Sequence, residues 1–116
     1  MTPQLSTYDA ALAALLAQKV QLEDNLFKLQ AACTSDAQRQ NIAASYHTAV
    51  TQYENALNLK LIQNNAAVLQ NIAAITAVQR QIQDAIDQAN AIANILNKIT
   101  TGIQIGTSIL KLMAAA

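Results

Sequence analysis

Apolar residues recur every three or four positions along the first part of the chain. The series is Leu5, Tyr8, Leu12, Leu15, Lys19, Leu22, Leu26, Leu29 and Cys33. Lys19 is its only charged member, and the spacing is typical of a helix that buries one face. Leu16, Val20 and Phe27 widen this apolar face, so we expect them to point toward the core too. The pattern predicts a helix from about residue 3 to residue 32.

A short polar break separates this segment from the next. Ser35 followed by Gln38 matches a capping box, and Asp36 places negative charge at the start of a new helix. The connection at 33–35 is too short for anything but an antiparallel return. The first two helices are therefore expected to form an antiparallel helical hairpin.

A second apolar series runs from Ile42 to Ile103 with a mean spacing of about 3.6 residues, that of a straight helix. No Gly or Pro lies between Ser35 and Thr101. This pattern favours one very long helix over about 36–100. The helix at 3–32 could cover only half of it, so the molecule would be an all-α, coiled-coil-like rod that needs a partner chain.

The alternative is a compact three-helix bundle with a bend at Asn64-Asn65 and a short C-terminal helix. Asn is suited both to ending a helix and to capping the next one. The sequence leaves rod and bundle open. In either case residues 1–116 are expected to form a single helical domain.

The kind of apolar residue changes near Leu61, because most Leu residues lie before it and nearly all Ile residues lie after it. β-Branched Ile in a helical seam can determine the oligomeric state. We therefore expect a homo-oligomer, or a larger protein partner, at the Ile-rich face. The predicted interface residues are Val68, Ile72, Ile75, Ile82, Ile86, Ile92 and Leu96.

The last segment, 102–116, is apolar on nearly every side and contains both glycines of the chain. Its spacing does not separate a helix from a strand over 102–110. It is expected either to cap the bundle or to dock on a partner or a membrane. The candidate residues are Gly102, Ile103, Ile105, Gly106, Ile109, Leu110, Leu112 and Met113.

Composition narrows the classes of function. The chain has 12% charged residues and zero net charge, against 24 Ala, 14 Gln and 10 Asn. Zero net charge argues against nucleic-acid binding, and amide-rich helices can be buried more cheaply than charged ones. We find no cleaved signal peptide and no long apolar span, which fits a cytoplasmic protein or one exported without a cleaved signal.

Candidate chemistry is sparse. His47 is the only histidine and is expected at the surface, while Cys33, the only cysteine, is expected in the core. Arg80 and Asp84 are spaced for a surface ion pair on one helix face. We therefore predict no catalytic site, no metal site and no cofactor.

Three functions remain open at this point. The first is a non-enzymatic structural or protein-protein interaction module, acting through helix packing as a scaffold, adaptor or inhibitor. The second is a membrane-active protein that stores an apolar C-terminal segment, and the third is a small immunity or antitoxin-like partner.

Overall fold

The computed structural model describes residues 7–59 and 65–115, and these residues form helices and no strands. The helices are α1 (Thr7–Asp24), α2 (Leu26–Ala32), α3 (Asp36–Leu57), α4 (Ala66–Asp87) and α5 (Ile92–Ala115). α2 continues α1 almost without a break. The Asn25 N–H donates to the Gln21 carbonyl (3.2 Å), and the Asn25 carbonyl accepts from the Leu29 N–H (2.9 Å). The predicted all-α class is confirmed.

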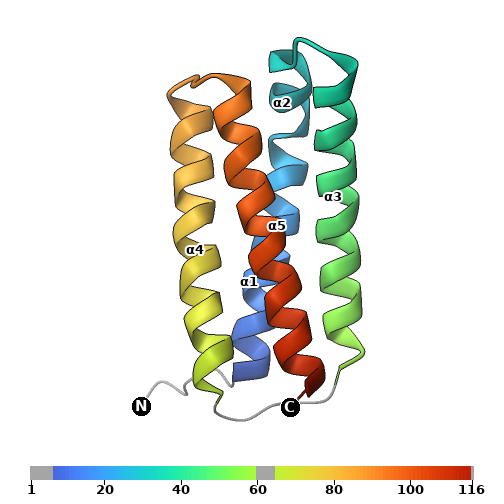
Figure 1. The fold of residues 1–116 in the computed structure, drawn as a ribbon, viewed down its shortest axis with the longest axis vertical. Helices are drawn as coiled ribbons and strands as arrows, with labels where there is room; N and C mark the ends of the chain where they lie inside the picture. Colours follow the sequence, from blue (N-terminus) through green and yellow to red (C-terminus); the bar gives the residue numbers. More distant parts are fainter. Residues whose placement is uncertain (1–6, 60–64, 116) are drawn as a thin grey trace.

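The helices form a four-membered bundle in which neighbouring segments run up, down, up and down (Figure 1). α1 packs against α3 and α4, and α5 packs against the same two helices, so α1 and α5 occupy opposite corners. The molecule measures 45 × 28 × 19 Å and has a radius of gyration of 14.6 Å. These dimensions are those of a compact domain, for which about 13 Å is expected.

The single helix expected over 36–100 is wrong, because the chain leaves the helix after Leu57 and again after Asp87. Part of the alternative is confirmed. Asn65 caps α4, since its side-chain oxygen accepts from the Val68 N–H at 3.1 Å; Asn64 lies outside the described residues. The cap at Ser35 is also confirmed, because its hydroxyl accepts from the Gln38 N–H at 3.2 Å.

The second break, at residues 88–91, has no counterpart in either expected architecture. The Asn90 N–H donates to the Ala85 carbonyl (2.9 Å) and the Ala89 N–H to the Ile86 carbonyl (3.1 Å). These two bonds define a Schellman motif, which requires a left-handed residue where Ala89 stands. Ala89 has a φ of 54°. Glycine usually occupies this position, so an alanine gives no sign of a helix end.

The apolar core consists of two clusters stacked along the bundle. The cluster near α2 includes Leu29, Ile42 and Ile99. The cluster at the opposite end includes Leu15 and Ile109, together with residues from α3 and α4. Each cluster therefore joins all four segments of the bundle.

A polar layer formed by two buried glutamines contacts three of the four segments. Gln18 and Gln52 are only 4% and 3% exposed. Gln18 Nε2 donates to Gln52 Oε1 at 2.7 Å, and Gln52 Nε2 donates to the Ile103 carbonyl (2.9 Å) and to Thr107 Oγ1 (3.1 Å). This layer ties α1, α3 and α5 together through one pair of side chains.

Glycines of α5 face this layer. A Cβ placed on Gly106 would overlap the Gln52 amide, whereas a Cβ on Gly102 would meet Gln18 Oε1 at an ordinary 3.4 Å. The segment 102–115 is helical throughout, which resolves the ambiguity between helix and strand. Gly106 therefore provides the space that the Gln52 side chain occupies.

A second series of amides joins α1 to α4. Gln21 Nε2 donates to the Gln79 carbonyl (2.7 Å), and Gln79 Nε2 donates to the Ala14 carbonyl (3.0 Å). One turn further, Asn25 Nδ2 donates to Gln83 Oε1 (3.1 Å). These bonds fix how far α1 is shifted along α4.

We expect opposite effects from alanine at the two glycines. Gly106→Ala should lower the free energy of unfolding by about 1–2 kcal/mol, because the Gln52 amide must move away from its buried partners. Gly102→Ala should raise it by up to about 1 kcal/mol through helix propensity alone. Urea unfolding of both variants measures the difference, and equal effects at the two positions would contradict the packing described here.

Ala89→Gly should raise the free energy of unfolding by about 1 kcal/mol, because glycine adopts the positive φ of this position without a steric cost. Ala77→Gly is the matched control, because Ala77 is exposed in the interior of α4. That control should lower stability by about 1 kcal/mol. Thermal unfolding of the two variants against the parent chain tests the Schellman motif.

Candidate functional site

The residues expected at an interface between chains contribute to the core of this chain. Six of the seven are buried, and Ile72 is partly buried at the edge of the cluster that contains Leu15. The buried ones are Val68, Ile75, Ile82, Ile86, Ile92 and Leu96. Their side chains pack against the neighbouring helices and do not form an exposed apolar face.

The candidate tail residues lie on α5 and divide between two environments. Gly102, Gly106, Ile109 and Met113 are buried. The other four are half-buried beside them, namely Ile103, Ile105, Leu110 and Leu112. Within 7–59 and 65–115, no helix is both long enough and apolar enough to cross a membrane.

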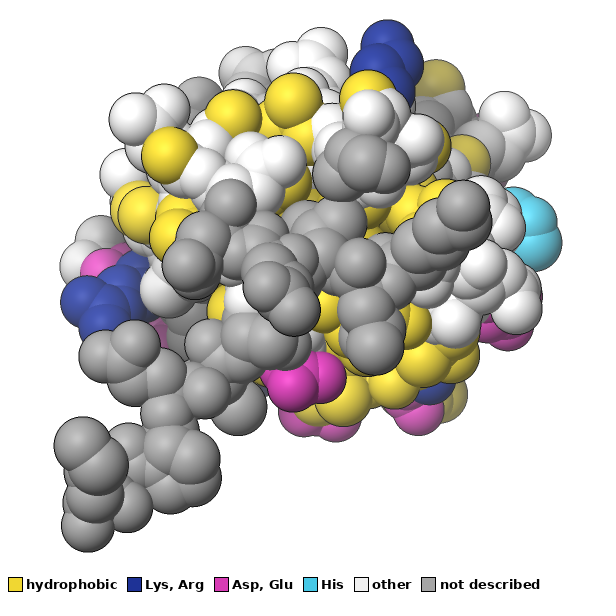
Figure 2. Space-filling model, turned by 90° about the horizontal axis from the view of Figure 1, so that it is seen from below, with side chains coloured by type: hydrophobic (Ala, Val, Ile, Leu, Met, Phe, Trp, Pro, Cys, Tyr) yellow, Lys and Arg dark blue, Asp and Glu magenta, His cyan; other side chains and the backbone are white. Residues whose placement is uncertain are grey.

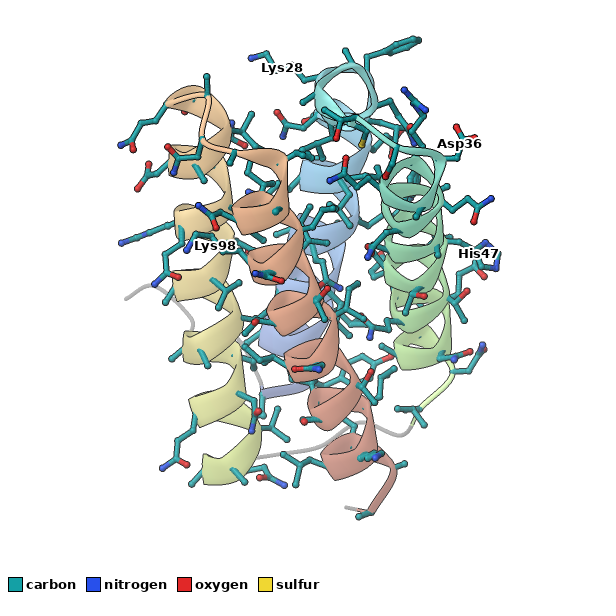
Figure 3. The ribbon with its side chains drawn as sticks, turned by 45° about the horizontal axis from the view of Figure 1, so that its top comes forward. Lys28, Asp36, His47 and Lys98 are labelled. Atoms are coloured by element: carbon teal, nitrogen blue, oxygen red, sulfur yellow. The ribbon has the colours of Figure 1, made fainter. Side chains whose placement is uncertain are left out.

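The titratable side chains do not converge. Lys28, Asp36, His47 and Lys98 lie at separate places on the surface (Figure 3). Cys33 is buried, and its thiol donates to the Leu29 carbonyl at 3.2 Å. In the described part of the chain, no three His, Cys, Asp or Glu side chains lie close enough together to hold a metal ion.

Ion pairing also differs from the expectation. The expected pair of Arg80 with Asp84 is not formed, whereas Arg39 Nη1 contacts Asp36 Oδ1 at 2.8 Å. Asp36 is almost fully solvent-exposed and Arg39 is about half exposed, so the pair adds little to stability.

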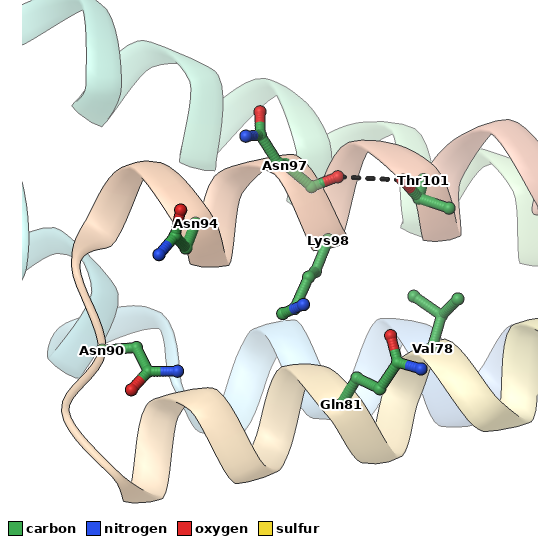
Figure 4. A pocket seen from close by; sticks show the side chains of 7 residues that line it. All are labelled: Val78, Gln81, Asn90, Asn94, Asn97, Lys98 and Thr101. Atoms are coloured by element: carbon green, nitrogen blue, oxygen red, sulfur yellow. Dashed lines mark hydrogen bonds between the residues drawn. The ribbon is translucent and has the colours of Figure 1, made fainter.

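A polar groove of about 390 Å³ lies between α4 and α5 near the 88–91 turn (Figure 4). Lys98 extends from α5 toward α4 and lies between Asn90 and Gln81. Asn94, Asn97, Thr101 and Val78 complete the lining. Its amides are exposed, and the Thr101 hydroxyl donates to the Asn97 carbonyl of its own helix. The groove combines one ammonium with neutral amides and has no pair of groups suited to acid-base chemistry.

The most distinctive surface lies on the outer side of α1 and α2. Phe27 is 93% exposed, and Val20 and Leu16 are 41% and 37% exposed. At 100° per residue these three side chains fall within about 40° of one another, and the middle of this arc lies about 120–140° around the helix from the buried Leu15 and Leu22. We call Leu16, Val20 and Phe27 the outer stripe; it is about 16 Å long at 1.5 Å per residue.

The prediction that these three residues widen the core face is wrong. α1 contacts α3 through Tyr8, whose hydroxyl donates to the Ala56 carbonyl, and contacts α4 through its amide bonds. The face of α1 between these two sets of contacts is already occupied by the apolar residues that recur every three or four positions, such as Leu15 and Leu22. Positions on the other side of α1 from that series face solvent.

Alanines and charges border the outer stripe. Exposed Ala13, Ala17 and Ala31 lie beside it. Glu23 and Asp24 are both exposed. At 100° per residue Glu23 falls between the stripe and Lys19, toward α3, and Asp24 falls between the stripe and Gln21, toward α4. Lys19 lies at the α3 edge, where its Nζ is 5.9 Å from the centre of the Tyr53 ring.

An apolar groove of about 300 Å³ adjoins the stripe between α2 and α3. Leu26, Ala43, Tyr46 and Val50 supply most of its apolar lining, with Gln30 and His47 at its rim. The groove lies on the same edge of the helix as Lys19. The apolar surface therefore extends from the outer stripe toward α3.

Elsewhere in the described chain, large apolar side chains are exposed singly. Leu57 is the last residue of α3, and Leu69 lies near the start of α4. At that end of the bundle hydrophobic side chains lie in groups beside polar ones, and charged side chains are few and scattered (Figure 2). Single exposed apolar residues are normal, whereas an aligned series on one helix face is not.

Comparison with protein-family models, with curated proteins and with solved structures gives no match.

Proposed function

We propose that this chain is a non-enzymatic protein-protein interaction module that binds its partner through the outer stripe of α1 and α2. The observation that carries the proposal is the 93% exposure of Phe27 in line with Leu16 and Val20. A core that already joins all four segments does not need these side chains. Covering them by a partner would add apolar burial that the isolated chain lacks.

The free energy gained by burying the outer stripe is large enough for specific binding. Full burial of one Phe or Leu side chain is worth about 1.5–3 kcal/mol. Aromatic anchors near the centre of an interface commonly supply most of its binding energy. Phe27 is the aromatic residue of the stripe, and alanines beside it allow another helix to approach closely.

Scaffold, adaptor and inhibitor, including an immunity-type inhibitor, all use such a surface, and each remains a proposal. A membrane-active role of the C-terminal segment is the less supported alternative. Releasing α5 would remove Ile109 and Met113 from the core and Gly106 from beside Gln52. No observation on the described residues favours that release.

Site-specific crosslinking tests the proposal. A photoreactive phenylalanine analogue at Val20 should form an adduct with one protein in the cells that produce the chain. The same analogue at Gln104, an exposed position on the outer side of α5, should not. Adducts in equal yield at the two positions, or at neither, would contradict a role for the outer stripe.

Phe27→Ser should reduce the adduct yield at Val20 about tenfold or more, because one anchor side chain no longer becomes buried. At a protein concentration low enough that the chain is unbound, it should leave the thermal midpoint unchanged within about 1 °C, because an almost fully exposed side chain contributes little burial to folding. Measuring both quantities on one preparation separates loss of binding from loss of fold.

A further inference from the structure

We infer that the occupant of the outer stripe is a second copy of this chain, packed antiparallel along α1 around a twofold axis beside Gln21. The inference rests on the proposed function and names its partner. It is based on the charges at the edge of the stripe, on the order of its apolar residues and on the adjoining groove.

The two charged residues at the α3 edge of the stripe, Lys19 and Glu23, can pair with each other between two copies of the chain. Lys19 lies two residues before Gln21 and Glu23 two residues after it. In an antiparallel pair centred on Gln21, residues equally far before and after it lie at the same level. A twofold axis perpendicular to α1 also keeps the α3 edges of both copies on the same side. Lys19 of each copy therefore meets Glu23 of the other.

The side chains of this edge are available for such a pair. Among the described residues Glu23 is exposed and has no ion-pair partner. Lys19 is held at the edge by its contact with the Tyr53 ring, so its ammonium is already placed near the stripe. Less side-chain entropy is then lost when the intermolecular pair forms.

The apolar residues fit the same register. Leu16 lies five residues before Gln21 and Phe27 six residues after it, so Leu16 of one copy lies within one residue of the level of Phe27 of the other. This contact occurs twice. Between the two contacts, the two Val20 side chains lie about 3 Å apart along the axis. All three residues of the outer stripe are used.

The groove between α2 and α3 agrees with this arrangement. Leu26, which lines it, is five residues after Gln21 and so lies level with Leu16 of the second copy. Both lie on the α3 side of the interface. The second copy therefore brings an apolar side chain to the mouth of an apolar groove of about 300 Å³.

A parallel pair is less favourable. Glu23 lies seven residues after Leu16 and thus nearly on the line of the stripe. Parallel twofold packing would bring the two Glu23 carboxylates together at one level, and like charges across a helix seam repel. The antiparallel pair places a lysine opposite each of them instead.

Light scattering with sedimentation on charge variants tests this inference. The parent chain should form a dimer of twice the 12.4 kDa chain mass. Lys19→Glu and Glu23→Lys should each weaken dimerisation about tenfold, because each places like charges together twice. Mixing the two variants should restore dimerisation to the parent level, since the heterodimer pairs two acidic with two basic side chains. Lys111→Glu, on the exposed side of α5, is the charge control and should have no effect.

The outcomes separate this inference from the proposed function. A monomeric parent chain whose Val20 analogue crosslinks to a different protein would overturn the second copy and leave the interaction surface standing. A monomer that forms no adduct would overturn both. A dimer that mixing fails to restore would overturn the antiparallel register, provided that circular dichroism shows each variant folded.

Discussion

The hydrogen bond between Gln18 and Gln52 is the constraint on which the rest of the bundle depends. Two amides buried among apolar side chains must satisfy each other, because an unpaired buried amide costs about 1–3 kcal/mol. Gln52 also binds the Ile103 carbonyl and Thr107, so one side chain sets the relative positions of three segments. The arrangement requires Gly106, where any side chain would fill the space of the amide.

The same requirement explains the unusual composition. In the described residues every buried side-chain nitrogen and oxygen has a hydrogen-bond partner. Gln and Asn residues, which are abundant where charged residues are few, therefore form hydrogen bonds inside the bundle as well as lying on its surface. Apolar packing alone allows one straight helix to shift along another. The hydrogen bonds of the Gln21 and Gln79 side chains form at only one such position. A chain with 12% charged residues thus specifies its packing through neutral polar groups.

Local signals predicted much of this fold. Capping chemistry located the start of α3 and, in the alternative bundle, that of α4, because Ser35 and Asn65 act within three residues of themselves. The end of α4 could not be predicted, since Ala89 adopts a left-handed conformation without the glycine that normally marks it. The regular spacing of apolar residues also continues from α4 into α5 at Ile92, so this spacing predicted one helix where there are two. Gln18 and Gln52 look like surface residues until their partners on distant helices are known.

The prediction that the outer stripe faces the core was wrong for a related reason. Leu16, Val20 and Phe27 are apolar, and periodicity cannot tell a wide core face from two separate faces on one helix. The distinction depends on which neighbours flank α1, and these are set by contacts such as Tyr8 with Ala56 and Gln79 with Ala14. Once those contacts fix the rotation of α1, the three residues must face outward. A Phe that is 93% exposed adds almost no burial to folding, and this exposure in line with Leu16 and Val20 is what supports the proposed interaction surface.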